Sequence, residues 1–550
     1  MNRGLLYAAA LAVASLLIGG SLTAQDAGGA FAGHGYQPGI DVLDYDIILE
    51  LPAEGPMLRG DVTVSARRAR GVRTLRLDLV RTLTVRQVQV NGRDVRASRD
   101  HDAIDVPLDD AAGDSVQVRV RYDGEVRDGL IVRRDDRGRW TWFGDNWPNR
   151  ARQWLPTVDH PSDKATVSWT VRAPSGITVV ANGTLTGTRP LTGRDAGRTE
   201  TRWRESHPVP TYVMVIGAGP LARVQIAGAE CAAPASAGCV RQEVYVLPEN
   251  RDYMPGPFAA APGIVALFER LVGPFPYEKL AHVQSETRFG GMENATAIFY
   301  AGSLFPSHRM SEGLIAHETA HQWFGDAVTE REWGHLWLSE GFATYFATLW
   351  TRASRGDSAW HAELAGIRSQ VLADSVVQRR PVLDTAQTDY LALLNANSYQ
   401  KGGYVLAMLN RLLGDSAFFA GLQAYYAEHR DGNALTADLR HALEQSSGRE
   451  LGQFFDQWLR RPGVAELTVG WAHDAASGTV SVLVLQDPAR AYAVPLTVEL
   501  TDGQGVKRRI ELSVPAEPRA ELVLPGRFAE RPVSIVLDPD LFLLARISRP

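Results

Sequence analysis

The first part of the chain alternates apolar and polar residues with a period of two, which is typical of β-strands with one solvated face. Turn dipeptides separate the alternating runs, as at Asn91-Gly92, Asp123-Gly124 and Asn182-Gly183. Clear examples of the alternation are segments 45–51 (YDIILEL), 74–79 (TLRLDL) and 115–120 (SVQVRV). We therefore expect an antiparallel β domain over residues 41–221.

The pattern then changes twice. Strand-like runs continue to His282-Val283-Gln284, and helical periodicity dominates from Ser311 to Trp458. Alternation returns near the end, as in 479–485 (TVSVLVL) and 509–514 (RIELSV). The expected fold is multidomain α+β, in which a mixed domain over residues 222–462 follows the β domain and a small β-sandwich over residues 463–550 comes last.

The N-terminal residues predict export. Asn2-Arg3 gives a positive start, residues 5–18 are apolar or small, and further small residues lead to Ala24. The run is short for a membrane-spanning helix, which favours a signal peptide over residues 1–24, cleaved near Ala24, over an uncleaved anchor. Residues 25–40 would then be a linker. The mature protein is expected in the periplasm or secreted, without a membrane span.

Composition excludes some partners. The chain has 550 residues, of which 45% are hydrophobic and 22% charged, with a net charge of −6. These values are ordinary for a soluble globular protein of several domains. Basic and acidic residues are interspersed, so we expect no nucleic-acid partner. The sequence does not indicate an oligomeric state.

The two cysteines, Cys231 and Cys239, bracket the segment AAPASAG. In an oxidising compartment they can close a small surface loop, which stabilises a fold by about 2–3 kcal/mol in the chain-entropy model. The alternative is two free thiols, and the predicted export favours the disulfide. No histidine is near either cysteine in the sequence, so neither is expected to be catalytic.

Segment 314–325 (LIAHETAHQWFG) carries the strongest candidate chemistry. Helix formers dominate it, and Gly325 is a natural end for the helix. His317 and His321 are four residues apart, so a helix presents both imidazoles on one face, as two zinc ligands require. Glu318 beside them can act as a general base.

A third ligand follows in segment 337–345 (WLSEGFATY). Ser339 is a plausible helix cap, so Glu340 would lie in a first turn, from which a second helix can deliver its carboxylate to the metal. Two histidines and one glutamate leave the fourth position for water, which predicts one catalytic zinc ion per chain. The alternative is a set of polar side chains satisfied within a core. His335 is expected in a supporting or loop position, and no role is expected for His282 and His308.

With these motifs the chain resembles the aminopeptidase N and leukotriene-hydrolase family of zinc peptidases. Gly290-Gly291-Met292-Glu293-Asn294 is similar to the exopeptidase signature of that family, and segment 398–402 (SYQKG) is similar to its tyrosine motif. Segment 151–156 (ARQWLP), with Asp159 and 164–166 (KAT) after it, resembles the family's N-terminal domain. The resemblance runs in consistent order from about Tyr45 to Gly463.

The resemblance implies a thermolysin-like catalytic domain and a zinc aminopeptidase whose partners are peptides with a free N-terminus. Glu293 would pair with the substrate ammonium, beside Met292. Gly290 and Gly291 carry no Cβ, so their backbone can approach the peptide closely. Tyr399 would donate a hydrogen bond to the oxyanion of the transition state.

Two departures from the family pattern stand out. Many members hold the substrate amine with a glutamine or glutamate shortly before the Ala-Arg stretch, where this chain reads WFGDNWPN (142–149). Asp145 and Asn146 are both candidates for that role, and the tryptophans there are expected to pack in the interior. In addition, the chain stops after the small β domain, so we expect no large helical C-terminal domain, and the substrate-length limits of relatives do not carry over.

Three rival functions are weighed against the aminopeptidase. A thermolysin-type endopeptidase shares the metal motif, but a carboxylate at Glu293 would repel or be wasted on the interior of a peptide. An inactive scaffold of the same fold typically lacks zinc ligands, whereas all the candidate ligands and catalytic residues are present here. Epoxide hydrolysis of a lipid is the third, and no residue requires it. The preferred N-terminal residue is not readable from the sequence.

Overall fold

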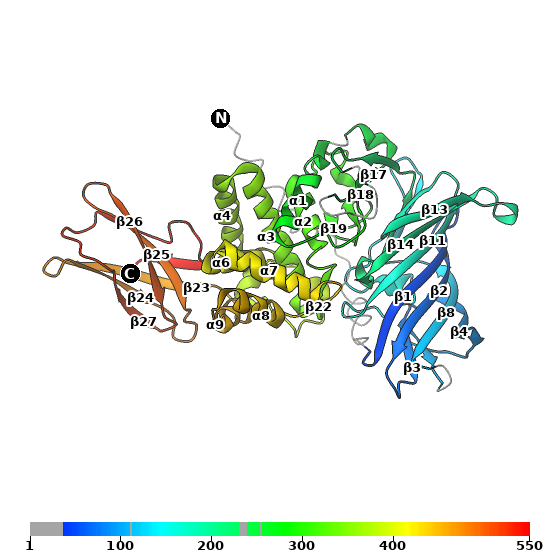
Figure 1. The fold of residues 1–550 in the computed structure, drawn as a ribbon, viewed down its shortest axis with the longest axis horizontal. Helices are drawn as coiled ribbons and strands as arrows, with labels where there is room; N and C mark the ends of the chain where they lie inside the picture. Colours follow the sequence, from blue (N-terminus) through cyan, green and yellow to red (C-terminus); the bar gives the residue numbers. More distant parts are fainter. Residues whose placement is uncertain (1–36, 110–112, 230, 232–238, 254–255) are drawn as a thin grey trace. The chain divides into compact units, whose positions relative to one another are not determined.

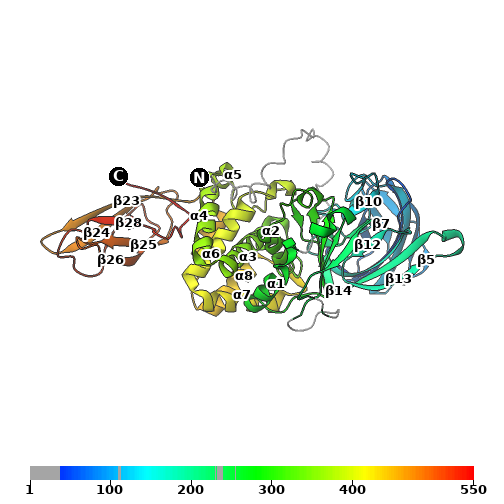
Figure 2. The same cartoon turned by 90° about the horizontal axis from the view of Figure 1, so that it is seen from above.

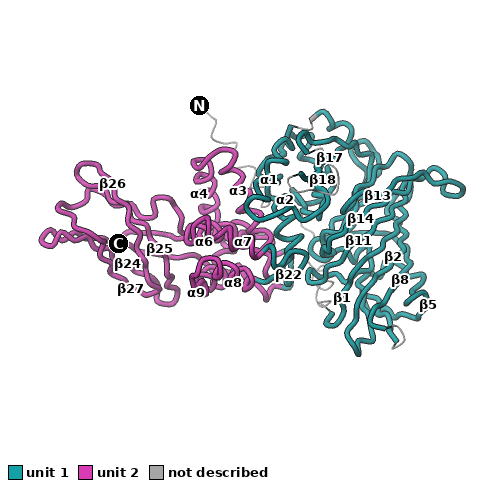
Figure 3. The backbone as a smooth tube through the Cα atoms, viewed as in Figure 1, with its two compact units in different colours: residues 1–333, 388–391, 426–435 teal, residues 334–387, 392–425, 436–550 magenta. Residues whose placement is uncertain are grey.

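The computed structural model describes residues 37–109, 113–229, 231, 239–253 and 256–550. The predicted signal peptide and most of the predicted linker lie outside the described residues. The chain divides into two compact units, which Figure 3 shows in teal and magenta. Unit 1 holds residues 1–333, 388–391 and 426–435, and unit 2 holds residues 334–387, 392–425 and 436–550.

An eight-stranded sheet forms much of the N-terminal region of unit 1 (Figure 1). Its neighbouring strands are antiparallel, except for one parallel pair, β1 with β11. Buried and exposed side chains alternate along the strands, which confirms the predicted antiparallel β domain. In sheet order the strands are β13 (Thr184–Pro190), β14 (Arg198–Pro210), β11 (Lys164–Pro174), β1 (Ile40–Glu50), β2 (Met57–Arg68), β8 (Ser115–Glu125), β4 (Leu83–Val90) and β5 (Arg93–Asp94).

Two smaller sheets lie in the same region, and several of their strands are labelled in Figure 2. One has the order β3 (Thr74–Asp78), β7 (Ala103–Pro107) and β6 (Ser98–Asp100). The other has the order β12 (Thr178–Ala181), β15 (Ile216–Gly219), β10 (Trp140–Gly144) and β9 (Leu130–Arg134).

One predicted turn is wrong. Asn91-Gly92 and Asn182-Gly183 do separate strands, but Asp123-Gly124 lies inside β8. Gly124 pairs with Leu83 of β4, and a Cβ on Gly124 would come within 2.7 Å of the Thr82 carbonyl oxygen. The glycine therefore allows two strands to approach closely, and it does not mark a chain reversal.

The rest of unit 1 is mixed α/β. Its five-stranded sheet has the order β16 (Ala222–Gln225), β17 (Gln242–Val246), β18 (Leu280–Ser285), β20 (Ala297–Ala301) and β19 (Gly291–Met292). Strands β17, β18 and β20 run parallel, and the short β19 pairs antiparallel at the edge. The remaining elements are α1 (Ala261–Leu271), α2 (Glu312–His321), β21 (Val328–Glu330) and β22 (Gly432–Ala434).

Unit 2 begins with helices, as the periodicity between Ser311 and Trp458 predicts. They are α3 (Trp337–Arg355), α4 (Asp357–Ala373), α5 (Ser375–Arg379), α6 (Gly402–Leu413), α7 (Asp415–His429, of which residues 426–429 belong to unit 1), α8 (Thr436–Ser447) and α9 (Gly452–Phe455). Two π-helical turns occur among them, η11 (Asn397–Lys401) and η12 (Asp456–Arg460). Among the described residues, the short 3₁₀ turns are η3 (Ala151–Gln153), η4 (Gly193–Asp195), η5 (Thr211–Val213), η6 (Pro248–Tyr253), η7 (Gly256–Phe258), η8 (Gly302–Leu304), η9 (Trp333–His335) and η10 (Tyr390–Leu393).

The C-terminal part of unit 2 is a β domain of two sheets, as predicted. One sheet has the order β27 (Arg519–Val523), β24 (Thr479–Leu485), β23 (Ala465–Asp474) and β29 (Ala545–Ser548). The other has the order β26 (Lys507–Val514), β25 (Val494–Thr501) and β28 (Ser534–Leu537). The multidomain α+β fold class is therefore confirmed.

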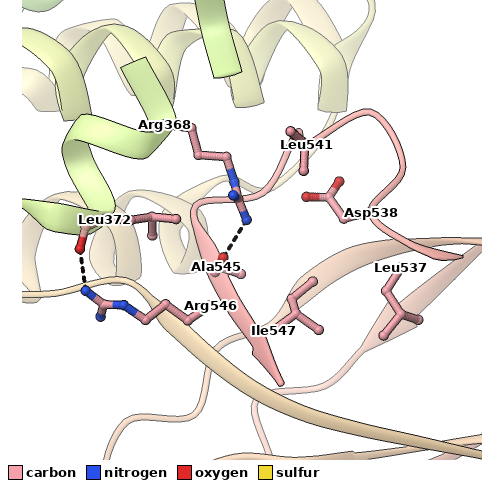
Figure 4. A pocket seen from close by; sticks show the side chains of 8 residues that line it. All are labelled: Arg368, Leu372, Leu537, Asp538, Leu541, Ala545, Arg546 and Ile547. Atoms are coloured by element: carbon pink, nitrogen blue, oxygen red, sulfur yellow. Dashed lines mark hydrogen bonds between the residues drawn. The ribbon is translucent and has the colours of Figure 1, made fainter. Parts of the chain in front are cut away.

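Arginines join this β domain to helix α4 (Figure 4). Arg368 donates from Nε to the Leu543 carbonyl oxygen at 2.7 Å and from Nη2 to that of Ala545 at 2.5 Å. Arg546 donates in return to the carbonyl oxygen of Leu372. A cavity of about 370 Å³ lies at this seam and is lined by Arg368, Leu372, Leu537, Asp538, Leu541, Ala545, Arg546 and Ile547. None of the candidate catalytic residues is part of this lining.

Cys231 and Cys239 form a disulfide with their Cα atoms 6.0 Å apart, which confirms the favoured alternative. In the part of the chain that the structure describes, we find no helix with both the length and the apolar character needed to span a membrane.

Candidate active site

Helix α2 carries the two candidate histidine ligands. Ser311 caps its N-terminus, accepting a hydrogen bond from the Leu314 amide at 3.2 Å. The Nε2 atoms of His317 and His321 lie 3.3 Å apart. His321 Nδ1 lies 3.2 Å from the Phe324 carbonyl oxygen. A carbonyl can only accept, so Nδ1 carries the proton and Nε2 presents its lone pair toward His317.

This arrangement fits a tetrahedral zinc ion. Zinc–nitrogen bonds of about 2.0–2.1 Å at a tetrahedral angle require two nitrogen ligands roughly 3.3–3.4 Å apart. The observed separation of 3.3 Å agrees with that requirement. The contact of His321 with a backbone carbonyl is also the kind of outer bond that orients a ligating histidine.

The end of α2 differs from the prediction. The helix stops at His321, and Gly325 lies in the following turn with φ of +125°, where its amide donates to the Val328 carbonyl oxygen at 2.9 Å. The glycine thus closes the turn and does not end the helix.

Glu318, the candidate base, lies directly against the Gly291 backbone. Glu318 is only 4% exposed. A Cβ built on Gly291 would lie 2.1 Å from Glu318 Oε1, so a larger residue here would displace the Glu318 side chain. A Cβ on Gly290 would meet none of the described residues within 4 Å. The glycine at 291 therefore leaves room for the candidate base in its observed position, whereas Gly290 makes no comparable contact with the described residues.

Glu293 lies in the same group. One carboxylate oxygen of Glu293, one of Glu318 and a ring nitrogen of His321 all lie within 4.8 Å of one another. Met292, between Gly291 and Glu293, is buried and pairs with Phe299 of β20. The structure of unit 1 thus brings the Glu293 carboxylate close to Glu318 and His321.

Gln322, a site residue that the sequence pattern did not predict, holds this segment in place. Its Nε2 donates to the Glu293 carbonyl oxygen at 2.8 Å and to Asp326 Oδ2 at 2.8 Å. Its Oε1 accepts from the Thr296 amide at 2.8 Å. The side chain therefore links the turn after α2 to both sides of Asn294. In the sequence, only its position directly after His321 indicated that Gln322 belongs to the site.

Buried charges surround this turn. Burial raises the pKa of Asp326 well above its usual value, and the nearby Glu293 carboxylate raises it further. Lys164 of β11 donates from Nζ to the carbonyl oxygens of Asp326 and Ala327, each at 2.8 Å, and to that of Gly432 at 3.0 Å. Burial lowers the pKa of Lys164 to about 7. In the sequence Lys164 stands out only as part of the family resemblance, and the structure gives its contacts.

Glu340 and Tyr399 lie in unit 2. Tyr399 donates from its hydroxyl to Glu340 Oε1 at 2.6 Å. Glu340 is in the first turn of α3, as predicted, but Ser339 is not the cap. The helix begins at Trp337, two residues before Ser339. The Trp337 side chain is fully buried and donates from Nε1 to Thr436 Oγ1 at 2.9 Å, so packing of the indole favours this earlier start.

Close helix packing positions these two side chains. Tyr399 lies in the π-helical turn η11, which leads directly into α6. Such turns reorient side chains and are frequent at functional sites. Gly341 of α3 faces Gly402, and a Cβ on Gly341 would lie 3.0 Å from the Gly402 carbonyl carbon. The two backbones therefore meet next to Glu340 and near Tyr399.

The structure separates the two candidates for a second amine-binding residue. Asn146 is fully buried and committed to the interior, because its amide donates to the carbonyl oxygens of Thr211 and Met214 and its oxygen accepts from Trp154. Asp145 is also fully buried and lies within 3.1 Å of two arginine side chains. Asn146 is therefore structural. The tryptophans of this segment, Trp142 and Trp147, are buried as predicted.

The other histidines have ordinary environments. His335 Nδ1 lies 2.9 Å from Thr436 Oγ1, and burial lowers the pKa of His335 to about 4. His282 is fully buried, with Nδ1 3.0 Å from the Tyr300 hydroxyl, and burial lowers the pKa of His282 to about 3. Both contacts are structural, in line with the sequence prediction.

Two family profiles match the chain. Residues 42–213 match the Peptidase M1 N-terminal domain, and residues 261–458 match the Peptidase family M1 domain. An aminopeptidase N of Streptomyces lividans is 28% identical over 433 residues, which are 72% of this chain and 48% of that protein. Aminopeptidase M1 of Arabidopsis thaliana is 30% identical over 335 residues, which are 58% of this chain and 36% of that protein. The chain spans about half the length of the curated relatives it matches.

Solved structures show the same similarity. An M1 zinc metallopeptidase from Deinococcus radiodurans is 28% identical with a TM-score of 0.66, and the match covers 76% of this chain and 93% of that one. A mutant of that enzyme bound to a Tyr-Ser-Ala substrate is 26% identical with a TM-score of 0.66, and the match covers 77% of this chain and 94% of that one.

Proposed function

The chain belongs to peptidase family M1, the family of aminopeptidase N, and on this premise we propose that it is a zinc-dependent aminopeptidase acting on peptides with a free α-amine. One observation carries the proposal: the Glu293 carboxylate lies within 4.8 Å of ligand atoms of Glu318 and His321. A buried carboxylate attracts an ammonium group more strongly than an exposed one does. A peptide bound there begins next to the base, so its first carbonyl is the one presented for reaction.

Zinc is the cofactor that the family and its solved members indicate. We propose that His317 and His321 of α2 and Glu340 of α3 hold one zinc ion per chain. The 3.3 Å separation of the two histidine nitrogens suits the metal, and the Tyr399 hydroxyl on Glu340 is a typical outer contact of a ligating carboxylate. Bound zinc would polarise the scissile carbonyl and lower the pKa of a water molecule to about 7.

The residues of the chain account for the other steps of hydrolysis. Glu293 holds the substrate ammonium and so orients the first peptide bond. Glu318 accepts a proton from the attacking water and delivers it to the leaving amine. The Tyr399 hydroxyl donates a hydrogen bond to the oxyanion that develops on the scissile carbonyl, in exchange for its contact with Glu340.

Hydrolysis of a panel of aminoacyl reporter amides and unmodified peptides tests this function. The protein should cleave substrates with a free amine, a chelator should abolish cleavage, and zinc should restore it. Nα-acetylated versions of the same peptides should be almost inert. Internal cleavage of acetylated peptides would establish the thermolysin-type endopeptidase, and no cleavage of any substrate by zinc-loaded protein would establish the inactive scaffold.

We also propose that the protein is exported to the periplasm or secreted, after cleavage near Ala24. The positive start and the short apolar run of residues 5–18 support this. The Cys231–Cys239 disulfide supports it as well, because disulfides persist in oxidising compartments. N-terminal sequencing of the protein from a fractionated host tests it. A mature N-terminus near Gln25 is expected, and full-length protein retained in the membrane would indicate an anchor instead.

A further inference from the structure

Four charged residues form a ring of ion pairs in unit 1, which we name the arginine clamp: Asp128, Asp145, Arg150 and Arg288. Asp145 Oδ2 lies 3.1 Å from Arg288 Nε and 3.0 Å from Arg150 Nη2. Asp128 Oδ1 lies 3.0 Å from Arg288 Nη2 and 2.9 Å from Arg150 Nη1. Each arginine therefore contacts both aspartates, and Arg288 is the member that comes from outside the N-terminal β region.

Arg288 lies in segment 286–294, which also carries Glu293. Two further contacts join this segment to the N-terminal β region. Phe289 packs edge-on against Trp147, with ring centroids 6.2 Å apart, and Glu286 pairs with Arg133 of β9. Three nearby residues of the segment are thus each held by the N-terminal β region.

The far end of the segment is fixed as well. The Gly290 carbonyl oxygen accepts from the Ala301 amide at 3.1 Å, Gly291 lies against Glu318, and the Glu293 carbonyl oxygen accepts from Gln322. The segment between Arg288 and Glu293 is therefore held at its start by the arginine clamp and at its end by the turn after α2. A shift at either end would move the Glu293 carboxylate relative to Glu318.

Asp145 itself is poorly suited to bind a substrate amine. Its side chain is 0% exposed, and its Oδ2 is shared by two guanidinium groups that already balance its charge. An incoming ammonium would meet those two positive groups. Its other oxygen, Oδ1, has no hydrogen-bond partner among the described residues, so direct amine binding is the rival that a test has to exclude.

We propose that Asp145 is a positioning residue, which acts through Arg288 to hold Glu293 and Gly291 in register with Glu318. This inference rests on the proposed aminopeptidase function. It gives the departure from the family pattern around Asp145 a physical role. The N-terminal β region holds the amine-binding segment through ion pairs with the Arg288 side chain, and Asp145 does not itself bind the amine.

A double-mutant cycle of Asp145→Asn and Arg288→Ala in the zinc-loaded full chain tests this. Each single change should lower kcat/KM for free peptides ~10- to 10²-fold, because small misplacements of reacting groups are costly. Each should also shrink the preference for free over acetylated peptides. The kcat/KM of the double variant should lie within about twofold of that of the more damaged single variant, because both substitutions remove the same contact. Arg288→Lys, which keeps the charge, should recover part of the loss.

Arg189→Ala is the matched control. Arg189 is an exposed arginine that pairs with a buried carboxylate, Glu200, at 2.9 Å. Glu200 keeps Arg172 and Arg202 as other partners. This variant should match the parent in kcat/KM within about twofold. Multiplicative losses in the cycle, or a loss in Asp145→Asn with none in Arg288→Ala, would show that Asp145 binds the amine itself and would overturn the inference.

Amide hydrogen exchange of segment 286–294 provides a readout that does not depend on activity. Exchange there should be faster in Asp145→Asn and in Arg288→Ala than in the parent, and unchanged in Arg189→Ala. Unchanged exchange in both clamp variants would contradict the inference. If the parent cleaved no free-amine substrate, the proposed function would fail, and the exchange data would still decide whether the clamp positions the segment.

Discussion

The candidate residues of unit 1 are held by polar contacts between distant segments, whereas those of unit 2 are held by contact between helix backbones. In unit 1, Gln322 and Lys164 bind carbonyl oxygens of the loops around Glu293 and after α2. In unit 2, Gly341 meets Gly402 where a Cβ would come within 3.0 Å of the opposing carbonyl carbon.

This difference determines which changes each group tolerates. Removing a polar group from unit 1 leaves buried carbonyls without a donor, which costs about 1–3 kcal/mol for each. Adding volume in unit 2 forces two backbones apart, which typically costs about 1–3 kcal/mol. Unit 1 should therefore be sensitive to lost hydrogen bonds, and unit 2 to added methyl groups.

The largest effect is expected from the base in unit 1. Glu318→Gln keeps the shape of the side chain and removes its basicity, so kcat should fall ~10²–10⁴-fold. Zinc content should stay at one ion per chain, because Glu318 is not a proposed ligand. Steady-state kinetics and elemental analysis of one preparation check both. Loss of zinc together with activity would mean that Glu318 acts on the metal site.

The corresponding change in unit 2 is Tyr399→Phe. Loss of the hydroxyl removes a donor to the developing oxyanion, so kcat should fall ~10²–10³-fold with little change in KM. Tyr404→Phe is a matched control, since Tyr404 is a buried tyrosine of α6 whose hydroxyl bonds the Leu541 carbonyl oxygen in the C-terminal β domain. An unchanged kcat in Tyr399→Phe would show that this hydroxyl does not contribute to the transition state.

Lys164→Met tests the polar contacts of unit 1. It removes the ammonium donor that the carbonyl oxygens of Asp326, Ala327 and Gly432 share, of which Asp326 keeps a second donor, the Thr329 hydroxyl, so the free energy of unfolding should fall by roughly 3 kcal/mol. Calorimetry of zinc-loaded protein measures this. Lys507→Met is the control, because Lys507 is 66% exposed and makes a surface ion pair, worth about 0–1 kcal/mol. Equal effects in the two variants would contradict the comparison.

The smallest effect is expected from one methyl group in unit 2. Gly341→Ala should lower kcat by roughly tenfold, because Glu340 and Tyr399 move apart when the two backbones separate. Gly366→Ala in α4 is the matched control, since its Cβ would meet none of the described residues within 4 Å. That change should raise the unfolding midpoint through helix propensity. A Gly341→Ala variant as active as the parent would show that the close contact is not needed.

Much of the fold and the local part of the site follow from sequence periodicity. His317 and His321 lie together because the geometry of a helix alone brings residues four apart onto one face. The order of β, mixed and β regions follows from the change in hydrophobic period. These features depend on contacts within a few residues, which a local pattern encodes.

Contacts between distant segments were not predictable in the same way. Arg288 and Asp145 are 143 residues apart, and no local pattern pairs them. Ser339 has the chemistry of a helix cap, but α3 begins two residues earlier, at the buried Trp337. Asp123-Gly124 resembles a turn and lies in a strand, because its glycine accommodates the neighbouring strand β4. In each case contacts between distant segments determined the structure, and these contacts are not encoded in the local sequence pattern.

Glu293 is the residue that we expect to select the free N-terminus. The most direct test is the ratio of kcat/KM for a free peptide to that for its Nα-acetylated form, measured in the parent and in Glu293→Gln. The parent should prefer the free peptide by a large factor. Glu293→Gln should raise KM and lower kcat for the free peptide, and the ratio should fall toward one, because the neutral side chain no longer distinguishes an ammonium from an amide. A ratio that is large and equal in both proteins would contradict the account.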